Sequence, residues 1–87
     1  MEFYRRSALS GEKYDVFDKD IIKILNPLQS AFYVSRSVPI LDVRLSKDNL
    51  DRPILVYLFR RSQTKEVFDE WCRQKERERD KYGNNGN

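Results

Sequence analysis

The chain has 87 residues, which is enough for one small domain and too few for two independent cores. It is 39% hydrophobic and 13% aromatic, so a packed core is feasible and the composition argues against disorder of the whole chain. Its net charge of +3 is mildly basic, which permits nucleic acid or an acidic protein as a partner and requires neither.

The first half of the chain predicts an arm, an edge strand and a short helix. Residues 1–12 are interpreted as a flexible N-terminal arm, followed by a short edge strand over 13–17. Asp18 is a good N-cap residue, because its carboxylate can accept hydrogen bonds from the first backbone amides of a helix. We therefore expect a helix over residues 19–25, which Pro27 ends.

The middle of the chain predicts three strands. Residues 31–38 alternate between apolar and polar side chains, and residues 40–46 do so more clearly. The polar loop 47–53 is rich in turn formers and connects the second strand to a third one over 54–61. This third strand contains the longest apolar run of the chain, so we expect it to be the central strand of the sheet.

The last third of the chain predicts a helix. Ser62 is a suitable cap, and an apolar stripe at helical spacing follows, formed by Val67, Phe68, Trp71 and Cys72. Beyond Cys72 the charges alternate in sign at i,i+3 spacing, which is typical of a solvated helix extension. Residues 81–87 are interpreted as a disordered tail, so the folded domain is expected over residues 13–80.

These elements predict an α+β domain in two layers. We expect a three- to four-stranded antiparallel sheet with two helices on one face, in the order (β)αβββα.

Two stretches of the sequence carry a resemblance. Gln29 and Tyr33, then Pro39, Ile40 and Asp42, and finally Thr64-Lys65, Phe68-Asp69 and Trp71 form a pattern spread over residues 15–75. In this pattern the chain resembles a type of small, uncharacterised protein carried by plasmids, prophages and conjugative elements of Firmicutes. The resemblance implies a mobile-element setting, and it implies no activity and no site residues.

The residue content argues against an enzyme. The sequence has no histidine and one cysteine, so histidine-based catalysis and paired-cysteine metal or redox sites are excluded. The three glycines stand at positions 11, 83 and 86, outside the predicted elements, which excludes a phosphate-binding loop. We expect no catalytic residue, metal site, cofactor or small-molecule substrate.

The cysteine content and the hydropathy pattern indicate a compartment. A single cysteine cannot form an internal disulfide, which fits a reducing cytosol. No apolar run approaches the roughly 18 residues of a membrane span, and the first residues lack the apolar segment of a signal peptide. We expect a cytoplasmic protein without a membrane partner.

Function is expected to reside in the sheet face that the helices leave open. The helices are expected to cover Leu41, Val43, Leu45, Ile54, Val56 and Leu58. The opposite face then mixes aromatic and arginine side chains, and an exposed patch of this kind indicates a partner. The leading hypothesis is an accessory or regulatory protein that binds another protein, or a second copy of itself, through Tyr33, Arg44, Tyr57, Phe59 and Arg61.

Nucleic-acid binding by the same face is the alternative, since stacked aromatics and phosphate contacts need the same residue types. The residues proposed for it are Arg36, Arg44, Tyr57, Arg60 and Arg61.

Overall fold

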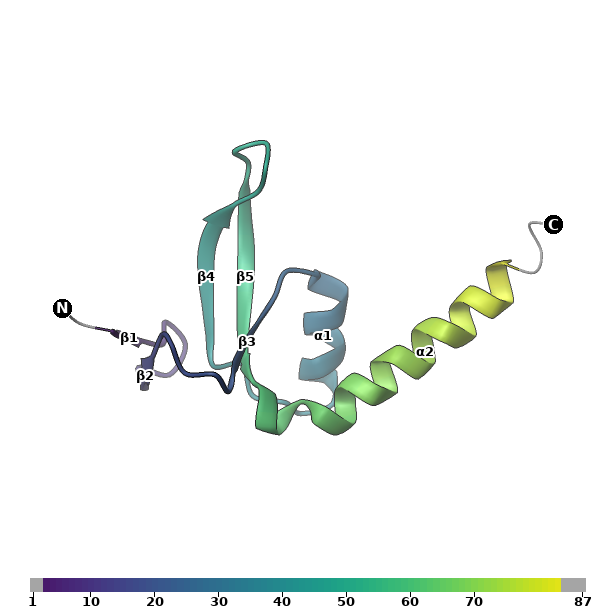
Figure 1. Ribbon diagram of the computed structural model, residues 1–87, viewed down its shortest axis with the longest axis horizontal. Helices are drawn as coiled ribbons and strands as arrows, with labels where there is room; N and C mark the ends of the chain where they lie inside the picture. The colour runs from purple at the N-terminus through teal and green to yellow at the C-terminus, as the bar shows by residue number, and fades with distance from the viewer. Residues whose placement is uncertain (1–2, 84–87) are drawn as a thin grey trace.

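The protein is an α+β domain, described here from a computed structural model that covers the backbone of residues 3–83 and the side chains of residues 3–79 (Figure 1). The elements in chain order are β1 (Tyr4–Arg6), β2 (Lys13–Asp15), β3 (Ile21–Ile24), α1 (Pro27–Ser35), β4 (Asp42–Lys47), β5 (Pro53–Arg60), a 3₁₀ turn η1 (Arg61–Gln63) and α2 (Lys65–Gly83).

The strands of the described chain form two antiparallel sheets. β5 lies at the centre of a three-stranded sheet of order β3-β5-β4, as its long apolar run predicts. β4 and β5 are joined by the polar loop and form the expected hairpin. β1 and β2 pair only with each other, and we call them, with the turn between them, the N-terminal hairpin.

The predicted helix over residues 19–25 is wrong, because this segment contains β3. The Asp18 side chain does act as a local cap, but it closes a tight turn: it accepts from the amide of Asp20 at 2.9 Å. The Asp18 carbonyl oxygen accepts from the amide of Ile21 at 3.1 Å. Three of the four residues of β3 are isoleucines, and this β-branched residue type favours strands when a neighbouring strand is available.

The predicted strand over residues 31–38 is also wrong, because α1 occupies most of it. Asn26 is the N-cap of α1, and its side-chain oxygen accepts from the amides of Leu28 at 2.9 Å and Gln29 at 3.4 Å. Pro27 follows at the first helical position, where its missing N–H costs nothing and its fixed φ suits the helix. Pro27 therefore starts a helix instead of ending one.

Both helices pack on one face of the three-stranded sheet, as predicted, but on the face opposite to the one expected. Tyr33 of α1, Phe59 of β5 and Val38 form the buried centre of the main apolar cluster. Trp71 of α2 packs against this cluster, and its ring lies 5.3 Å from that of Phe32. The helix-covered face therefore carries the aromatic side chains of β5.

The strand register explains the error. Val43 lies opposite Tyr57, so Val43 shares a face with the aromatics of β5 and not with Val56. Residues 54, 56 and 58 instead share a face with residues 42, 44 and 46. A shift of one residue in the relative register of two strands moves every side chain of one strand to the other face.

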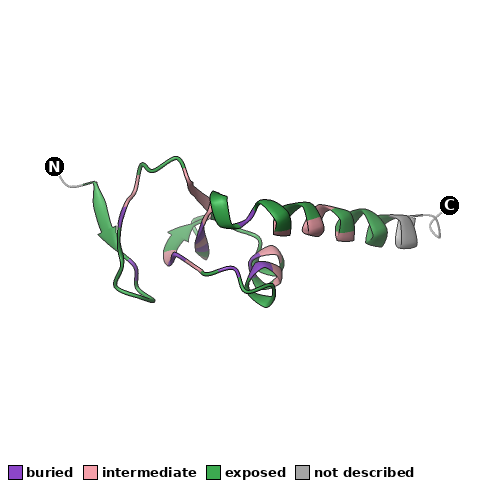
Figure 2. Cartoon of the chain, turned by 90° about the horizontal axis from the view of Figure 1, so that it is seen from below, coloured by how far each residue is buried: buried purple, intermediate pink, exposed green. Residues whose placement is uncertain are grey.

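The ends of the described chain differ from the expected arm and tail. The predicted arm over residues 1–12 contains β1, which pairs with β2 through Arg5 and Tyr14. α2 is the predicted C-terminal helix and is exposed over most of its length (Figure 2). Of the predicted tail, residues 81–83 belong to α2, and residues 84–87 lie outside the described part of the chain, as do residues 1–2.

Candidate functional site: an open sheet face lined with cations

The aromatic residues predicted to bind a partner are part of the core. Tyr33 and Phe59 have no exposed surface, and their ring centroids lie 5.2 Å apart in an edge-to-face contact. Tyr57 is half-buried and packs against the same cluster. The expectation that these three side chains lie on an open face is therefore wrong.

The two arginines of that prediction lie elsewhere. Arg44 is on the face that the helices leave open, where one guanidinium nitrogen lies 3.6 Å from the Asp42 carboxylate. Arg61 is exposed in η1, beyond the end of β5. The predicted partner-binding set is thus not brought together on one surface.

The residues proposed for nucleic-acid binding are also separated. Arg36 follows α1 and forms an ion pair with Glu70 of α2 at 2.8 Å. Arg60 pairs with Glu12 of the N-terminal hairpin at 2.8 Å. Because these guanidinium groups are engaged by carboxylates of the chain, they are poor candidates for phosphate contacts.

A different surface emerges on the open face of the sheet. It is a concavity of about 640 Å³ above β5, which we call the basic groove. Its apolar floor comes from alternate residues of β5, namely Ile54, Val56 and Leu58. The full lining is Arg5, Tyr14, Val16, Phe17, Ile21, Lys23, Leu25, Arg44, Leu45, Ser46, Lys47, Ile54, Val56 and Leu58.

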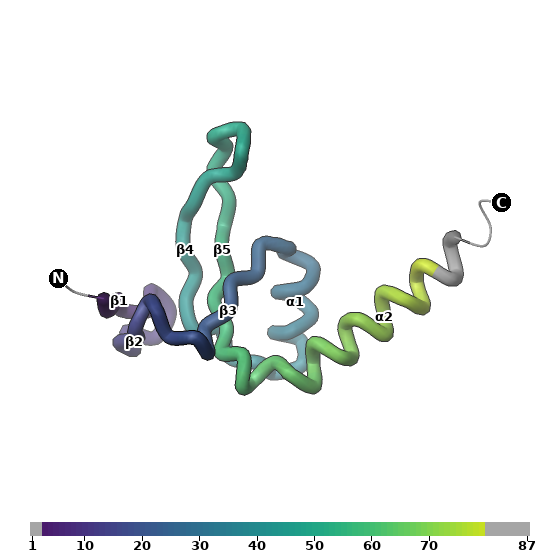
Figure 3. Tube along the Cα trace, viewed as in Figure 1, coloured from purple at the N-terminus to yellow at the C-terminus, as the bar shows by residue number. Residues whose placement is uncertain are grey.

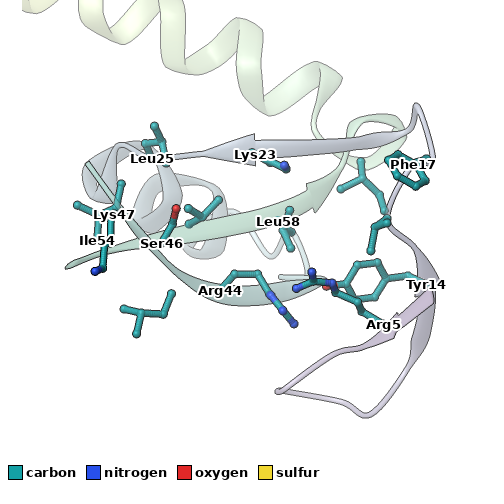
Figure 4. Close-up of a pocket in the computed structure, with 14 residues that line it drawn as sticks. Arg5, Tyr14, Phe17, Lys23, Leu25, Arg44, Ser46, Lys47, Ile54 and Leu58 are labelled. Carbon is teal, nitrogen blue, oxygen red and sulfur yellow. The ribbon is translucent and has the colours of Figure 1, made fainter. Parts of the chain in front are cut away.

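Three sides of the basic groove come from different elements (Figure 4). Lys23 of β3 and Arg44 of β4 lie on opposite sides of Leu58, while Arg5 and Tyr14 lie toward the N-terminal hairpin. The hairpin therefore closes one end of the groove.

The charges of the basic groove have one sign. Four cationic side chains line it, and no carboxylate does among the described residues. Arg44 has Asp42 beside it, and Lys47 pairs with Asp51 at 3.3 Å. Arg5 and Lys23 have no ion-pair partner within the described part of the chain. The groove thus offers positive charge that the fold itself does not neutralise.

The rim of the basic groove exposes large apolar side chains. Leu25 is 59% exposed and Phe17 is 70% exposed. The floor beneath is well packed, since Val56 and Leu58 are buried. Apolar and cationic groups together suit a ligand that is itself amphipathic and acidic.

Asp42 fixes the wall of the basic groove. This carboxylate has no exposed surface and lies beneath the N-terminal hairpin. One of its oxygens accepts from the backbone amides of Ala8 and Val43, each at 2.8 Å. The other accepts from the hydroxyl of Tyr14. A buried carboxylate needs such partners, and here two of the three come from the hairpin.

The environment of Tyr14 keeps its hydroxyl neutral. Tyr14 is buried in a small cluster with Leu41 and Leu58. Burial, the hydrogen bond to Asp42 and the negative charge of Asp42 raise the pKa of Tyr14 to about 12. The hydroxyl is therefore protonated at physiological pH and donates to Asp42.

Part of the basic groove can be predicted from the sequence. The alternation in residues 42–46 places Arg44 on the less apolar face, where it does line the groove. Nothing in that alternation distinguishes Asp42, which is buried, from a solvated aspartate. Lys23 is not among the predicted site residues, because the sequence predicts a helix over residues 19–25 and the structure has β3 there.

Two further kinds of site are absent from the described residues. No three histidine, cysteine, aspartate or glutamate side chains within residues 3–79 gather closely enough to hold a metal ion. No helix in the described part of the chain has the length and apolar character to span a membrane.

No protein family, curated protein or solved structure matches the chain.

Proposed function

We propose that the protein is a non-enzymatic binding protein, of an accessory or regulatory kind, which docks an acidic amphipathic segment of another protein in the basic groove. The observation that carries the proposal is the ring of four cations around an apolar floor, with no carboxylate in the described lining.

The composition of β5 supports a bound partner. A strand that is apolar on both faces is typical of a sheet covered on both sides. The helices cover one side of β5, and the N-terminal hairpin covers only one end of the other. A partner segment lying along β5 would complete the second layer.

The charge distribution supports an acidic partner. Lys23 and Arg44 flank the floor on opposite sides (Figure 4). An amphipathic helix that places an apolar stripe over Ile54 and carries acidic residues on both flanks would meet a cation on each side. Complementary charge of this kind speeds association and selects against basic partners.

A display selection with a random peptide library tests the proposal. We expect selected peptides to combine acidic residues with leucine-type residues at helical spacing. Their affinity should fall by about tenfold or more in the Arg5→Glu/Lys23→Glu double variant, because each reversal replaces attraction by repulsion. Lys65→Glu is the matched control, since Lys65 is an exposed lysine outside the groove.

The proposal fails if no peptide is selected, or if selected peptides are basic. It also fails if the double variant binds them as well as the wild type does. Circular dichroism of the double variant establishes that it is folded before binding is compared.

Nucleic-acid binding is the second candidate, and the same four cations favour it. Phosphate contacts release counterions, so the affinity for an oligonucleotide should fall steeply with salt. Titration of single- and double-stranded oligonucleotides at two salt concentrations tests it. Absence of binding at low salt would exclude nucleic acid as the occupant of the groove.

A further inference from the structure

The outer edge of β4 is the longest strand edge of the described chain that has no strand beside it. β3 is the opposite edge of the three-stranded sheet, but it has only four residues and is soon followed by Pro27. β4 has six residues, contains neither proline nor glycine, and continues with β5 past the end of β3 (Figure 3). An edge of this length presents a row of backbone N–H and C=O groups that can pair with a strand of another chain.

Two exposed leucines lie side by side at this edge. Leu45 of β4 is directly opposite Leu55 of β5, and they are 76% and 48% exposed. Both leucines are on the same face of the sheet as Tyr57 and Phe59. The helices cover that face around Phe59, at the end of β5 away from Leu55. The pair is a short apolar row that ends at the outer edge of the sheet.

A second copy of the chain completes this row. When two identical strands pair in antiparallel fashion about a two-fold axis, one residue of each lies opposite itself. With the axis at Leu45, the two copies form one row across four strands: Leu55, Leu45, Leu45 of the second copy and Leu55 of the second copy. Each leucine then has an apolar neighbour on the same face.

The charges of β4 also favour this register. With the axis at Leu45, Arg44 lies opposite Ser46 of the second copy, and Lys47 lies opposite Val43. With the axis one residue earlier, the two Arg44 guanidinium groups would face each other, and like charges directly opposite are destabilising. With the axis one residue later, Leu45 would lie opposite Lys47 of the second copy.

We propose that the protein forms a symmetric dimer by antiparallel pairing of its β4 edges about Leu45, which creates a continuous six-stranded sheet. The two-fold axis is perpendicular to the sheet, so both basic grooves lie on the same side of the dimer. The dimer does not depend on what the groove binds.

Light scattering coupled to size exclusion tests the proposal on the full chain. We expect a mass near twice the 10.5 kDa of the monomer, with dissociation on dilution. Leu45→Lys should weaken dimerisation by about tenfold or more, because it removes two leucines and places two like charges opposite each other. Leu50→Lys is the matched control, because Leu50 is 71% exposed and lies in the turn after β4.

Cysteine cross-linking tests the register in a Cys72→Ala background. Residues directly opposite on paired strands have Cβ atoms about 4.5–5.5 Å apart, close to what a disulfide needs. We expect Leu45→Cys to form a cross-linked dimer under mild oxidation and Ser46→Cys to form little. A wild-type chain that stays monomeric at high concentration overturns the proposal, as does cross-linking at position 46 in preference to position 45.

Discussion

The hydroxyl of Tyr14 donates a hydrogen bond to the carboxylate of Asp42, and this contact joins the N-terminal hairpin to the edge strand of the three-stranded sheet. The two residues are 28 positions apart in the sequence. Neither side of the contact is accessible to solvent to any large extent: Tyr14 is 5% exposed and Asp42 is 0% exposed. The buried carboxylate of Asp42 therefore helps to hold one wall of the basic groove, together with the packing of Tyr14 on Leu58 and the Arg60–Glu12 ion pair.

Removal of the Asp42 carboxylate is expected to destabilise the fold strongly. Asp42→Ala leaves the amides of Ala8 and Val43 and the Tyr14 hydroxyl without their acceptor. The Tyr14 hydroxyl is buried and the two amides are part-buried, and an unsatisfied buried donor costs about 1–3 kcal/mol, so the free energy of unfolding should fall by about 2 kcal/mol or more. Urea unfolding followed by circular dichroism measures this. Tyr14→Phe removes one of the three bonds and should cost less; an Asp42→Ala variant as stable as Tyr14→Phe would contradict the assigned role of Asp42.

Tyr14 also predicts a loss of stability in alkali. Its pKa is about 12 in the folded protein against 10.0 for an unperturbed tyrosine, so folding favours the protonated hydroxyl. The stabilisation is complete below pH 10 and is lost as the pH rises from 10 to about 12. The charged and titratable groups known to act on the hydroxyl are Asp42 and Arg5.

The measurement is the difference in free energy of unfolding between the wild type and Tyr14→Phe across this pH range. The difference should shrink as the pH rises, because only the wild type loses the neutral hydroxyl. A difference that stays constant up to pH 12 would show that Tyr14 is not held neutral by the fold.

The hydrogen bonds of Asp20 predict a loss of stability at low pH. Its carboxylate accepts from the amide of Ser62 at 2.9 Å and from the Ser62 hydroxyl at 2.8 Å, which connects the residue before β3 to η1. These hydrogen bonds hold the pKa of Asp20 below 3.8, so its stabilisation is present above that pH and is lost as the pH falls through the lowered pKa. A carboxyl titration by NMR should show a higher pKa for Asp20 in Ser62→Ala than in the wild type. Equal pKa values in the two proteins would mean that Ser62 does not hold the carboxylate.

The same substitution at Phe59 and at Phe68 should have very different effects on stability. Phe59→Ala should lower the free energy of unfolding by about 3–5 kcal/mol, because this side chain has no exposed surface and its removal leaves a cavity. Phe68→Ala makes the same change at a side chain that is 48% exposed, so the cost should be below about 1 kcal/mol. Thermal or urea unfolding compares the two variants. Comparable costs would contradict the assignment of Phe59 to the face under the helices.

The parts of the fold that the sequence predicted correctly have strong local patterns. The apolar run of β5, the alternation of β4 and the helical stripe around Trp71 each specify one element without reference to the rest of the chain. The α+β class followed from them.

The errors arose where two structures were compatible with the same residues. Asp18 before an apolar segment can cap a helix or close a turn, and only the presence of β5 beside Ile22 decides for a strand. Pro27 can end a helix or begin one, and the Asn26 cap decides for the beginning. The structure of both segments therefore depends on contacts with other residues or on cap geometry, and the spacing of apolar residues in the sequence shows neither.

The candidate site was harder to predict, because it depends on the register between strands. The sequence predicted an open sheet face as the binding surface, but it did not specify which alternate residues of β5 pair with those of β4. The aromatic residues Tyr57 and Phe59 proved to be on the covered side. The basic groove instead includes Lys23 and Arg5. The sequence predicted a helix around Lys23 and a flexible arm around Arg5, and the structure has strands in both places.

The single tryptophan of the chain packs against Phe32 between the two helices, on the other side of the sheet from the basic groove. The intrinsic fluorescence of the protein therefore reports on the seating of α2 against α1. A ligand in the groove that leaves the helices undisturbed would give no change in emission, and a spectral shift on binding would mean that its effect had crossed the β-sheet.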